Sequence, residues 1–123
     1  MLVDPLLQGR SQARSLRDDE KALLMALLST HPEFHSFEKE IASGEVQDMS
    51  DGGMGSVRFV APALRSFGAT LLRADYLDVD GVLVSIAINM DDQGKLYELD
   101  FWKTDFSLLK KYPQPELVKT RRD

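Results

Sequence analysis

The strict alternation of side chains between residues 82 and 90 constrains the fold of this chain more than any other feature of its sequence. Apolar residues stand at every second position of this stretch: Val82, Val84, Ile86, Ile88 and Met90. Successive side chains of a strand point to opposite faces, so this pattern predicts a strand with one face in the core. The protein therefore needs a sheet that is covered on one side.

A turn and a second alternating stretch follow directly. The turn at residues 91–94 ends with Gly94, at a position where a hairpin favours a positive φ. In the stretch 95–105, one set of alternate residues is Tyr97, Leu99 and Phe101, and the other is Glu98, Asp100 and Trp102. We expect the first set to face the core and the second set to form an acidic outer face.

Three shorter strands are expected before this hairpin. Residues 45–49 and 56–61 flank a glycine-rich segment, and residues 69–77 precede a turn rich in aspartate. Together with the hairpin, these segments predict an antiparallel meander of four or five strands.

Helical spacing is confined to the residues that precede these strands. A first helix should begin at a capping box formed by Ser15 and Asp18 and end near Thr30, because Pro32 disfavours helical geometry at the residue before it. Pro32 also suits the first turn of a second helix, which Gly44 should end. We therefore predict an α+β fold, in which an N-terminal helical hairpin packs on one face of the four- to five-stranded antiparallel meander sheet.

The domain boundaries are expected near the two ends of the chain. Residues 1–14 show no clear period and are interpreted as an N-terminal arm. Residues 15–113 form the single α+β domain. Pro113 and Pro115 precede a polar, basic end, so residues 114–123 are interpreted as a C-terminal tail.

Composition excludes several classes of function. The 123 residues include no cysteine, which excludes disulfides, thiolate metal sites, iron–sulfur clusters and a cysteine nucleophile. The net charge of -5 argues against binding to nucleic acid and favours a basic protein as partner. No apolar run approaches the roughly 20 residues that cross a bilayer, and the N-terminus lacks the pattern of a signal peptide. We therefore expect a cytoplasmic protein that does not bind membranes.

Three segments of the chain carry a resemblance to a known family. They are residues 51–56, residues 78–82 and residues 96–106, the last of which contains Trp102, Lys103 and Asp105. Together they resemble a family of small uncharacterised bacterial proteins classed as a domain of unknown function, over roughly residues 14–113. The resemblance implies a bacterial origin, and it implies no activity, cofactor or site.

The glycine-rich segment is a candidate binding loop, formed by Asp51, Gly52, Gly53, Met54 and Gly55. Backbone amides of successive glycines can surround an anion, which would make the chain a small-molecule or anion-binding domain. However, no Lys-Ser/Thr pair and no predicted helix follow the loop, so it does not meet the conditions of a phosphate-binding loop. A hairpin loop that needs unusual φ angles is the simpler interpretation.

Metal and catalytic sites are not favoured by the remaining polar residues. His31 and His35 are four residues apart, but the proline between them prevents the continuous helix that a zinc-protease motif needs. Glu98, Asp100 and Asp105 could act as acid or base in a hydrolase, although a solvated strand face is the favoured interpretation. We expect no metal, no cofactor and no catalytic residue.

Trp102 is the single tryptophan of the chain and lies on the polar face of its predicted strand. There it is either covered by the N-terminal arm or available to a partner. We favour a non-catalytic protein-binding module whose surface comprises Glu98, Asp100, Trp102, Lys103 and Asp105. Small acidic immunity proteins neutralise basic partners in this way. Anion binding by the glycine-rich loop and hydrolysis by the carboxylates are the alternatives.

Overall fold

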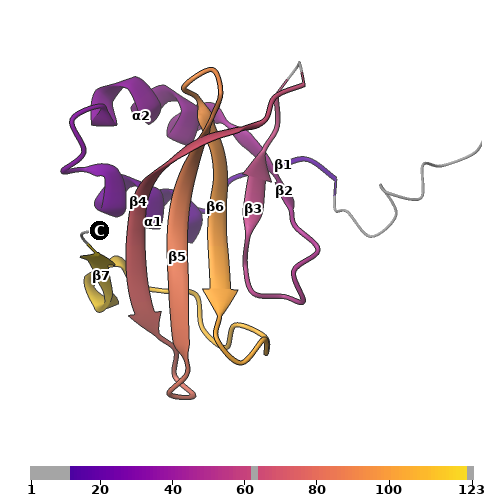
Figure 1. The fold of residues 1–123 in the computed structure, drawn as a ribbon, viewed down its shortest axis with the longest axis vertical. Helices are drawn as coiled ribbons and strands as arrows, with labels where there is room; N and C mark the ends of the chain where they lie inside the picture. Colours follow the sequence, from indigo (N-terminus) through magenta and orange to yellow (C-terminus); the bar gives the residue numbers. More distant parts are fainter. Residues whose placement is uncertain (1–11, 62–63, 122–123) are drawn as a thin grey trace, which may run out of the picture.

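The computed structural model describes residues 12–61 and 64–121, which form an antiparallel sheet with two helices against one of its faces (Figure 1). In chain order the elements are β1 (Arg14–Ser15), α1 (Asp18–Leu28), α2 (Phe34–Ser43), β2 (Glu45–Asp48), β3 (Val57–Phe59), β4 (Phe67–Leu77), β5 (Leu83–Asp91), β6 (Leu96–Lys103), the 3-10 helix η2 (Pro115–Leu117) and β7 (Val118–Arg121). The seven described strands lie in the order β1-β2-β3-β6-β5-β4-β7.

The predicted mixture of helices and an antiparallel sheet is confirmed, but the sheet is larger than expected. Four or five strands were predicted, whereas the described residues form seven. The strand order also departs from a simple meander, because β3 pairs with β6, with Val57 opposite Leu99, and β4 pairs with the far side of β5. The additional strands β1 and β7 contain two and four residues, too few to show a period of their own.

Strand β7 corrects the interpretation of residues 114–123 as a tail outside the domain. Val118 lies opposite Tyr76 and Arg121 opposite Arg73, so this segment is the edge strand beside β4. The prolines lead into η2, which turns the chain back along the sheet. At the other end, Arg14 already belongs to β1, and the rest of the predicted arm up to residue 11 lies outside the described residues.

The core lies between the helices and the inner face of the sheet. Its buried side chains include Leu23, Leu24, Leu27 and Leu28 of α1, Phe37 and Ile41 of α2, and Val46, Val57, Val84, Ile86, Ile88, Leu99 and Phe101 of the sheet. The predicted alternation of β5 is therefore confirmed at Val84, Ile86 and Ile88. The alternation ends at Met90, which is only half-buried. The pairing register between β5 and β6 shifts just before this residue.

The same register shift contradicts the expectation that Tyr97 faces the core. It leaves Tyr97 without a partner on β5, and Leu96 takes the fully buried position instead. Tyr97 is half-buried, and the guanidinium groups of Arg58 and Arg65 lie 5.1 and 5.0 Å from the centre of its ring. A bulge changes which side chains face inward, and alternation alone does not reveal it.

The start of α1 differs from the capping box expected at Ser15. The helix begins at Asp18, and its cap is the carboxylate of Glu20, which accepts a hydrogen bond from the backbone N–H of Arg17 at 2.8 Å. Glu20 is fully buried and binds both terminal nitrogens of the Arg14 guanidinium, at 2.8 and 2.9 Å. This charge pair fixes the start of the helix against strand β1.

Candidate functional site

Trp102 lies on the face of the sheet that carries no helix. Its neighbours Phe101 and Lys103 are buried on the inner side, whereas 51% of Trp102 is exposed. The residue opposite it on β5 is Ser85, whose small side chain leaves the indole uncovered. Trp102 is thus exposed on this face, whereas the arm up to residue 11, which the other alternative invoked, lies outside the described residues.

An exposed aromatic ring pairs with the indole. Phe106, in the turn after β6, contacts Trp102 edge to face, with 4.9 Å between ring centroids, and 64% of Phe106 is exposed. Its φ of 63° is the only positive φ of a non-glycine residue among the described residues. Holding a bulky residue in this region costs roughly 1–2 kcal/mol, so the turn keeps Phe106 beside Trp102 against its own backbone preference.

Two leucines extend this apolar surface onto the neighbouring hairpin. Leu83 of β5 lies opposite Leu77 of β4, and both are exposed on the outer face. Leu83 is two residues from Ser85, so it is a diagonal neighbour of Trp102. We call Leu77, Leu83, Trp102 and Phe106 the apolar patch.

Lys103 does not belong to this surface, although the sequence suggested it. Its side chain is fully buried on the inner side of β6, where the ammonium binds Asp78 at 2.9 Å, Asp80 at 2.6 Å and the carbonyl oxygen of Leu108 at 2.8 Å. Burial alone would lower the pKa of Lys103, but the hydrogen bonds that its ammonium donates to Asp80 and Asp78 raise it. Lys103 thus holds the β4–β5 turn to the chain that follows β6.

Asp78 completes this ion cluster. Its carboxylate is fully buried and accepts hydrogen bonds from the backbone N–H groups of Val79, Lys110 and Lys111, at 2.7, 2.7 and 3.1 Å. Although burial alone would raise the pKa of Asp78, these bonds and the Lys103 ammonium lower it. The cluster of Lys103, Asp78 and Asp80 therefore lies directly behind the turn that carries Phe106.

The three predicted carboxylates have separate environments. Glu98 pairs with Arg58 at 2.7 Å. Asp100 accepts a hydrogen bond from the Ser56 hydroxyl at 3.1 Å, and burial raises its pKa. Asp105 lies beyond the end of β6, where the hydroxyl and backbone N–H of Ser107 lower its pKa. This separation offers little support for a hydrolase that uses all three as acid or base.

The outer face is not acidic as a whole, which corrects the expectation drawn from β6 alone. Among the described residues, the strands place on it the acidic side chains Glu45, Asp75, Glu98 and Asp100 and the basic side chains Arg58, Arg73, Lys119 and Arg121. Arg121 pairs with Asp75 at 3.2 Å. The basic residues come from strands on either side of the hairpin, and only the strand order brings them to this face.

The glycine-rich loop is filled by one of its own side chains. The Asp51 carboxylate accepts hydrogen bonds from the backbone N–H groups of Met54 and Ser56, at 3.1 and 3.0 Å. Met54 is buried, and its sulfur accepts a hydrogen bond from the backbone N–H of Lys103 at 3.2 Å. The glycines have positive φ angles: 75° at Gly52, 80° at Gly53 and 106° at Gly55. The loop amides of Met54 and Ser56 already have an anionic partner in Asp51, so the geometry favours the hairpin-loop interpretation.

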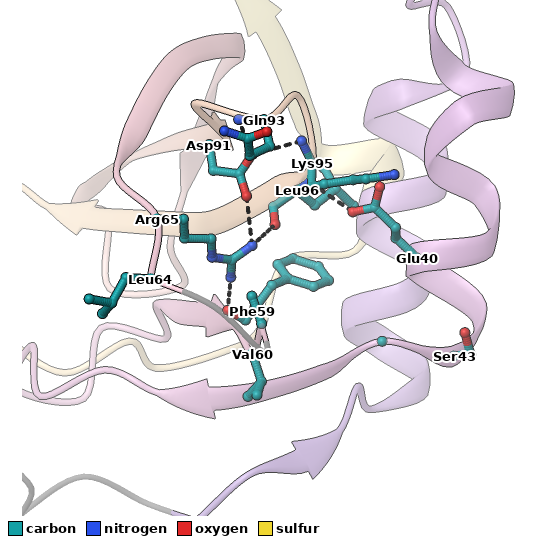
Figure 2. Close-up of a pocket in the computed structure, with 12 residues that line it drawn as sticks. Glu40, Ser43, Phe59, Val60, Leu64, Arg65, Asp91, Gln93, Lys95 and Leu96 are labelled. Atoms are coloured by element: carbon teal, nitrogen blue, oxygen red, sulfur yellow. Dashed lines mark hydrogen bonds and ion pairs between the residues drawn. The ribbon is translucent and has the colours of Figure 1, made fainter.

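Sequence reasoning missed a groove at the opposite end of the sheet. It has a volume of about 420 Å³ and lies between the last turn of α2, the end of β3 and the β5–β6 turn (Figure 2). Its principal lining residues are Glu40, Phe59, Val60, Arg65, Lys95 and Leu96. They come from distant parts of the chain, and no local motif connects them.

Arg65 forms a fixed wall of this groove. Its guanidinium binds the Asp91 carboxylate and the carbonyl oxygen of Leu96, both at 3.0 Å, and also the carbonyl oxygen of Phe59. Although burial alone would raise the pKa of Asp91, backbone hydrogen bonds and Arg65 lower it. Glu40 accepts a hydrogen bond from the backbone N–H of Leu96 at 2.7 Å, and burial raises its pKa.

These opposite pKa shifts predict an optimum of stability at mildly acidic pH. The raised pKa values of Glu40 and Asp100 mean that protonation favours the folded state, so the melting temperature should rise slightly as the pH falls from 7 towards the ordinary carboxyl pKa values of about 4. The stability contributed by Asp78 and Asp91, whose pKa values are lowered, is complete above about pH 4 and lost below it. Thermal melts across this pH range measure both the rise in melting temperature and the loss of stability at lower pH.

The double variant Glu40→Gln, Asp100→Asn is the control for that profile. It should remove the rise as the pH falls from 7 and leave the loss at lower pH in place. A melting temperature that falls steadily from pH 7 in the unmodified protein would contradict the assignment of the raised pKa values.

Metal binding finds no support in the described part of the chain. Within residues 12–61 and 64–121, no group of three or more His, Asp or Glu side chains could hold a metal ion. His35 contacts Glu38, and the ring of His31 lies 6.2 Å from that of Phe37. Among the same residues, none of the helices has the length and apolar character needed to span a bilayer.

Comparison with known proteins identifies a family for most of the chain. A family model described as a domain of unknown function, DUF6984, matches residues 13–113. No curated protein and no solved structure matches the chain significantly. The match confirms that a family of unknown function covers nearly the expected range, and it extends from β1 through the ion cluster to the residues just before η2. The chain belongs to the DUF6984 family, a domain of unknown function.

Proposed function

We propose that this chain is a non-catalytic protein-binding module that binds a basic partner protein through the apolar patch. The observation that carries the proposal is the pair of Trp102 and Phe106, whose rings contact each other while both stay more than half exposed. Large exposed apolar patches are uncommon on monomeric proteins and mark interaction sites. Tryptophan is also enriched among the interface residues that dominate binding energy. The pair is therefore suited to be the centre of an interface.

Preorganisation of the pair supports the same conclusion. Phe106 is held at a positive φ, and the ion cluster of Lys103, Asp78 and Asp80 lies behind its turn. Strain of this kind persists only where the surrounding structure enforces it, and it is concentrated at functional positions. A surface that is already ordered loses less conformational entropy on binding, which strengthens association.

Charges beside the pair favour a basic partner. Among the described residues, neither Asp100 nor Asp105 forms an ion pair, and both are close in sequence to Trp102. Glu98, by contrast, is neutralised by Arg58. A cationic side chain of the partner next to Asp105 would complement the net charge of -5. Blocking a basic enzyme in the bacterial cytoplasm, as immunity proteins do, is the role that this arrangement fits.

The proposal predicts that binding and stability respond separately to changes in the patch. Trp102→Ala should weaken binding by about 2 kcal/mol or more, roughly 30-fold, because the indole would be buried in the complex. The melting temperature should change little, because half of the side chain is already exposed. The partner is identified by crosslinking in cells, and its affinity for each variant is then measured with the purified proteins.

Leu117→Ala is the matched control, because Leu117 is an exposed apolar residue outside the patch. It should leave binding unchanged. Asp105→Lys should slow association in a way that depends on salt, without altering the fold. Equal affinity of the Trp102→Ala variant and the unmodified protein for the partner would exclude the patch as the interface.

A further inference from the structure

We propose that the groove between α2 and the β5–β6 turn binds a small zwitterion with an apolar side chain, such as a free aromatic or aliphatic amino acid. This site is independent of the protein interface proposed for the other end of the sheet. Its volume of about 420 Å³ falls within the range of small-molecule pockets, roughly 300–1,000 Å³.

The apolar part of the groove consists of Phe59, Val60 and Leu96. In the view of Figure 2, the Phe59 ring lies between Arg65 and Glu40. Val60 is 45% exposed although it directly follows a buried residue of β3. Phe59 and Leu96 are buried and form the floor, so a ligand side chain placed here would cover chiefly the exposed groups of Val60 and Leu64, and burying apolar surface is the general source of affinity in such pockets.

The polar groups of the groove differ in their remaining capacity to bind. Arg65 is occupied by three acceptors and serves as a wall. Among the described residues, only Leu96 donates to the Glu40 carboxylate, and it binds one oxygen, so the other oxygen can accept a donor from a ligand. Lys95 lines the same groove; its ammonium is close enough to Glu40 for its charge to lower the pKa of that carboxyl, but it forms no ion pair with a described residue. One anionic and one cationic group are therefore available.

This combination of charges selects the class of ligand. A simple cation would be attracted by Glu40 and repelled by Lys95, and a simple anion would meet the reverse. A zwitterion can place its ammonium on Glu40 and its carboxylate on Lys95, so both charges find a partner. Because the groove also has an apolar wall, the ligand should carry an apolar side chain next to these charges.

Three probes test this assignment: L-phenylalanine, N-acetyl-L-phenylalanine without the ammonium, and L-phenylalaninamide without the carboxylate. Binding to the full chain is followed by amide chemical shifts of Gln93, Lys95 and Leu96 in NMR titrations. We expect saturation by L-phenylalanine below about 10 mM, and binding about tenfold weaker for each probe that lacks a charge.

Variants match each charge of the probe to one residue. Glu40→Gln should bind L-phenylalanine about as weakly as the unmodified protein binds the N-acetyl probe, and should no longer distinguish these two probes. Lys95→Gln should likewise lose the distinction between L-phenylalanine and the amide. Glu38→Gln, also on α2 but outside the groove, is the control and should bind normally.

Two results would overturn the assignment. The first is the absence of saturable shifts at Gln93, Lys95 and Leu96 up to about 10 mM L-phenylalanine. The second is equal binding of all three probes, which would show that neither charge is recognised. Each variant is accepted for comparison only if its amide spectrum retains the dispersion of the folded protein.

Discussion

Ile86→Asp is expected to abolish cooperative folding, whereas Ala87→Asp, one residue further along the same strand, should leave a folded protein. Ile86 is 1% exposed and belongs to the core under α1. A carboxylate there has no partner, and its burial costs several kcal/mol, comparable to the roughly 5–15 kcal/mol that stabilise a whole domain. Loss of the cooperative thermal transition is the measurement.

Ala87→Asp is the matched control because it adds the same side chain to the opposite face. Ala87 lies opposite Arg73 on β4 and Asp100 on β6, so a carboxylate there has one favourable and one unfavourable neighbour. Its melting temperature should stay within a few degrees of that of the unmodified protein. If both variants unfold, sensitivity of β5 to any charge, rather than burial on one face, would explain the result.

Asp78→Ala is expected to cause the second-largest loss, about 3 kcal/mol or more of folding free energy. The substitution leaves the buried Lys103 ammonium with one carboxylate fewer and removes the acceptor of the Lys110 and Lys111 backbone N–H groups. For a domain of this size, the melting temperature should fall by roughly 10 °C. The turn that carries Phe106 should become mobile, which amide hydrogen exchange would detect.

Asp105→Ala is the control for this loss. Asp105 is exposed and accepts hydrogen bonds from the hydroxyl and backbone N–H of the neighbouring Ser107, so the melting temperature should be unchanged. If Asp78→Ala melts at the same temperature as the unmodified protein, the ion cluster does not hold the β4–β5 turn to the chain after β6. If it is destabilised but hydrogen exchange near Phe106 is unaffected, the strain at Phe106 has another source.

The central hairpin could be predicted from the sequence because its signals are local. Alternation between Val84 and Ile88 and the turn before Leu96 depend only on neighbours in the chain, and both features are present in the structure. The leucines of α1 could be placed in the core for the same reason. The same reasoning failed for Tyr97 and Lys103, because a bulge and a buried ion cluster both depend on partners distant in sequence.

The candidate sites differ in how far they could be predicted. Trp102 was singled out because a lone tryptophan on a polar strand face is a local pattern, but the sequence left open whether the N-terminal arm covers it. Its partner Phe106 was not identified, since the positive φ that brings the two rings together has no sequence signature in a residue other than glycine. The groove of Glu40 and Lys95 was missed entirely, because its lining residues belong to three separate elements.

By itself, the sequence determined the class of fold, the helices before the sheet and the faces of the central strands, because periodicity and turn residues act over a few positions. Tertiary structure decided the strand order, the edge strands β1 and β7, the burial of Lys103 and the basic residues on the outer face. These features depend on pairings between segments more than 12 residues apart, such as Lys103 with Asp78, 25 residues earlier. Their free energy is gained only when the whole chain folds, so no local pattern encodes them.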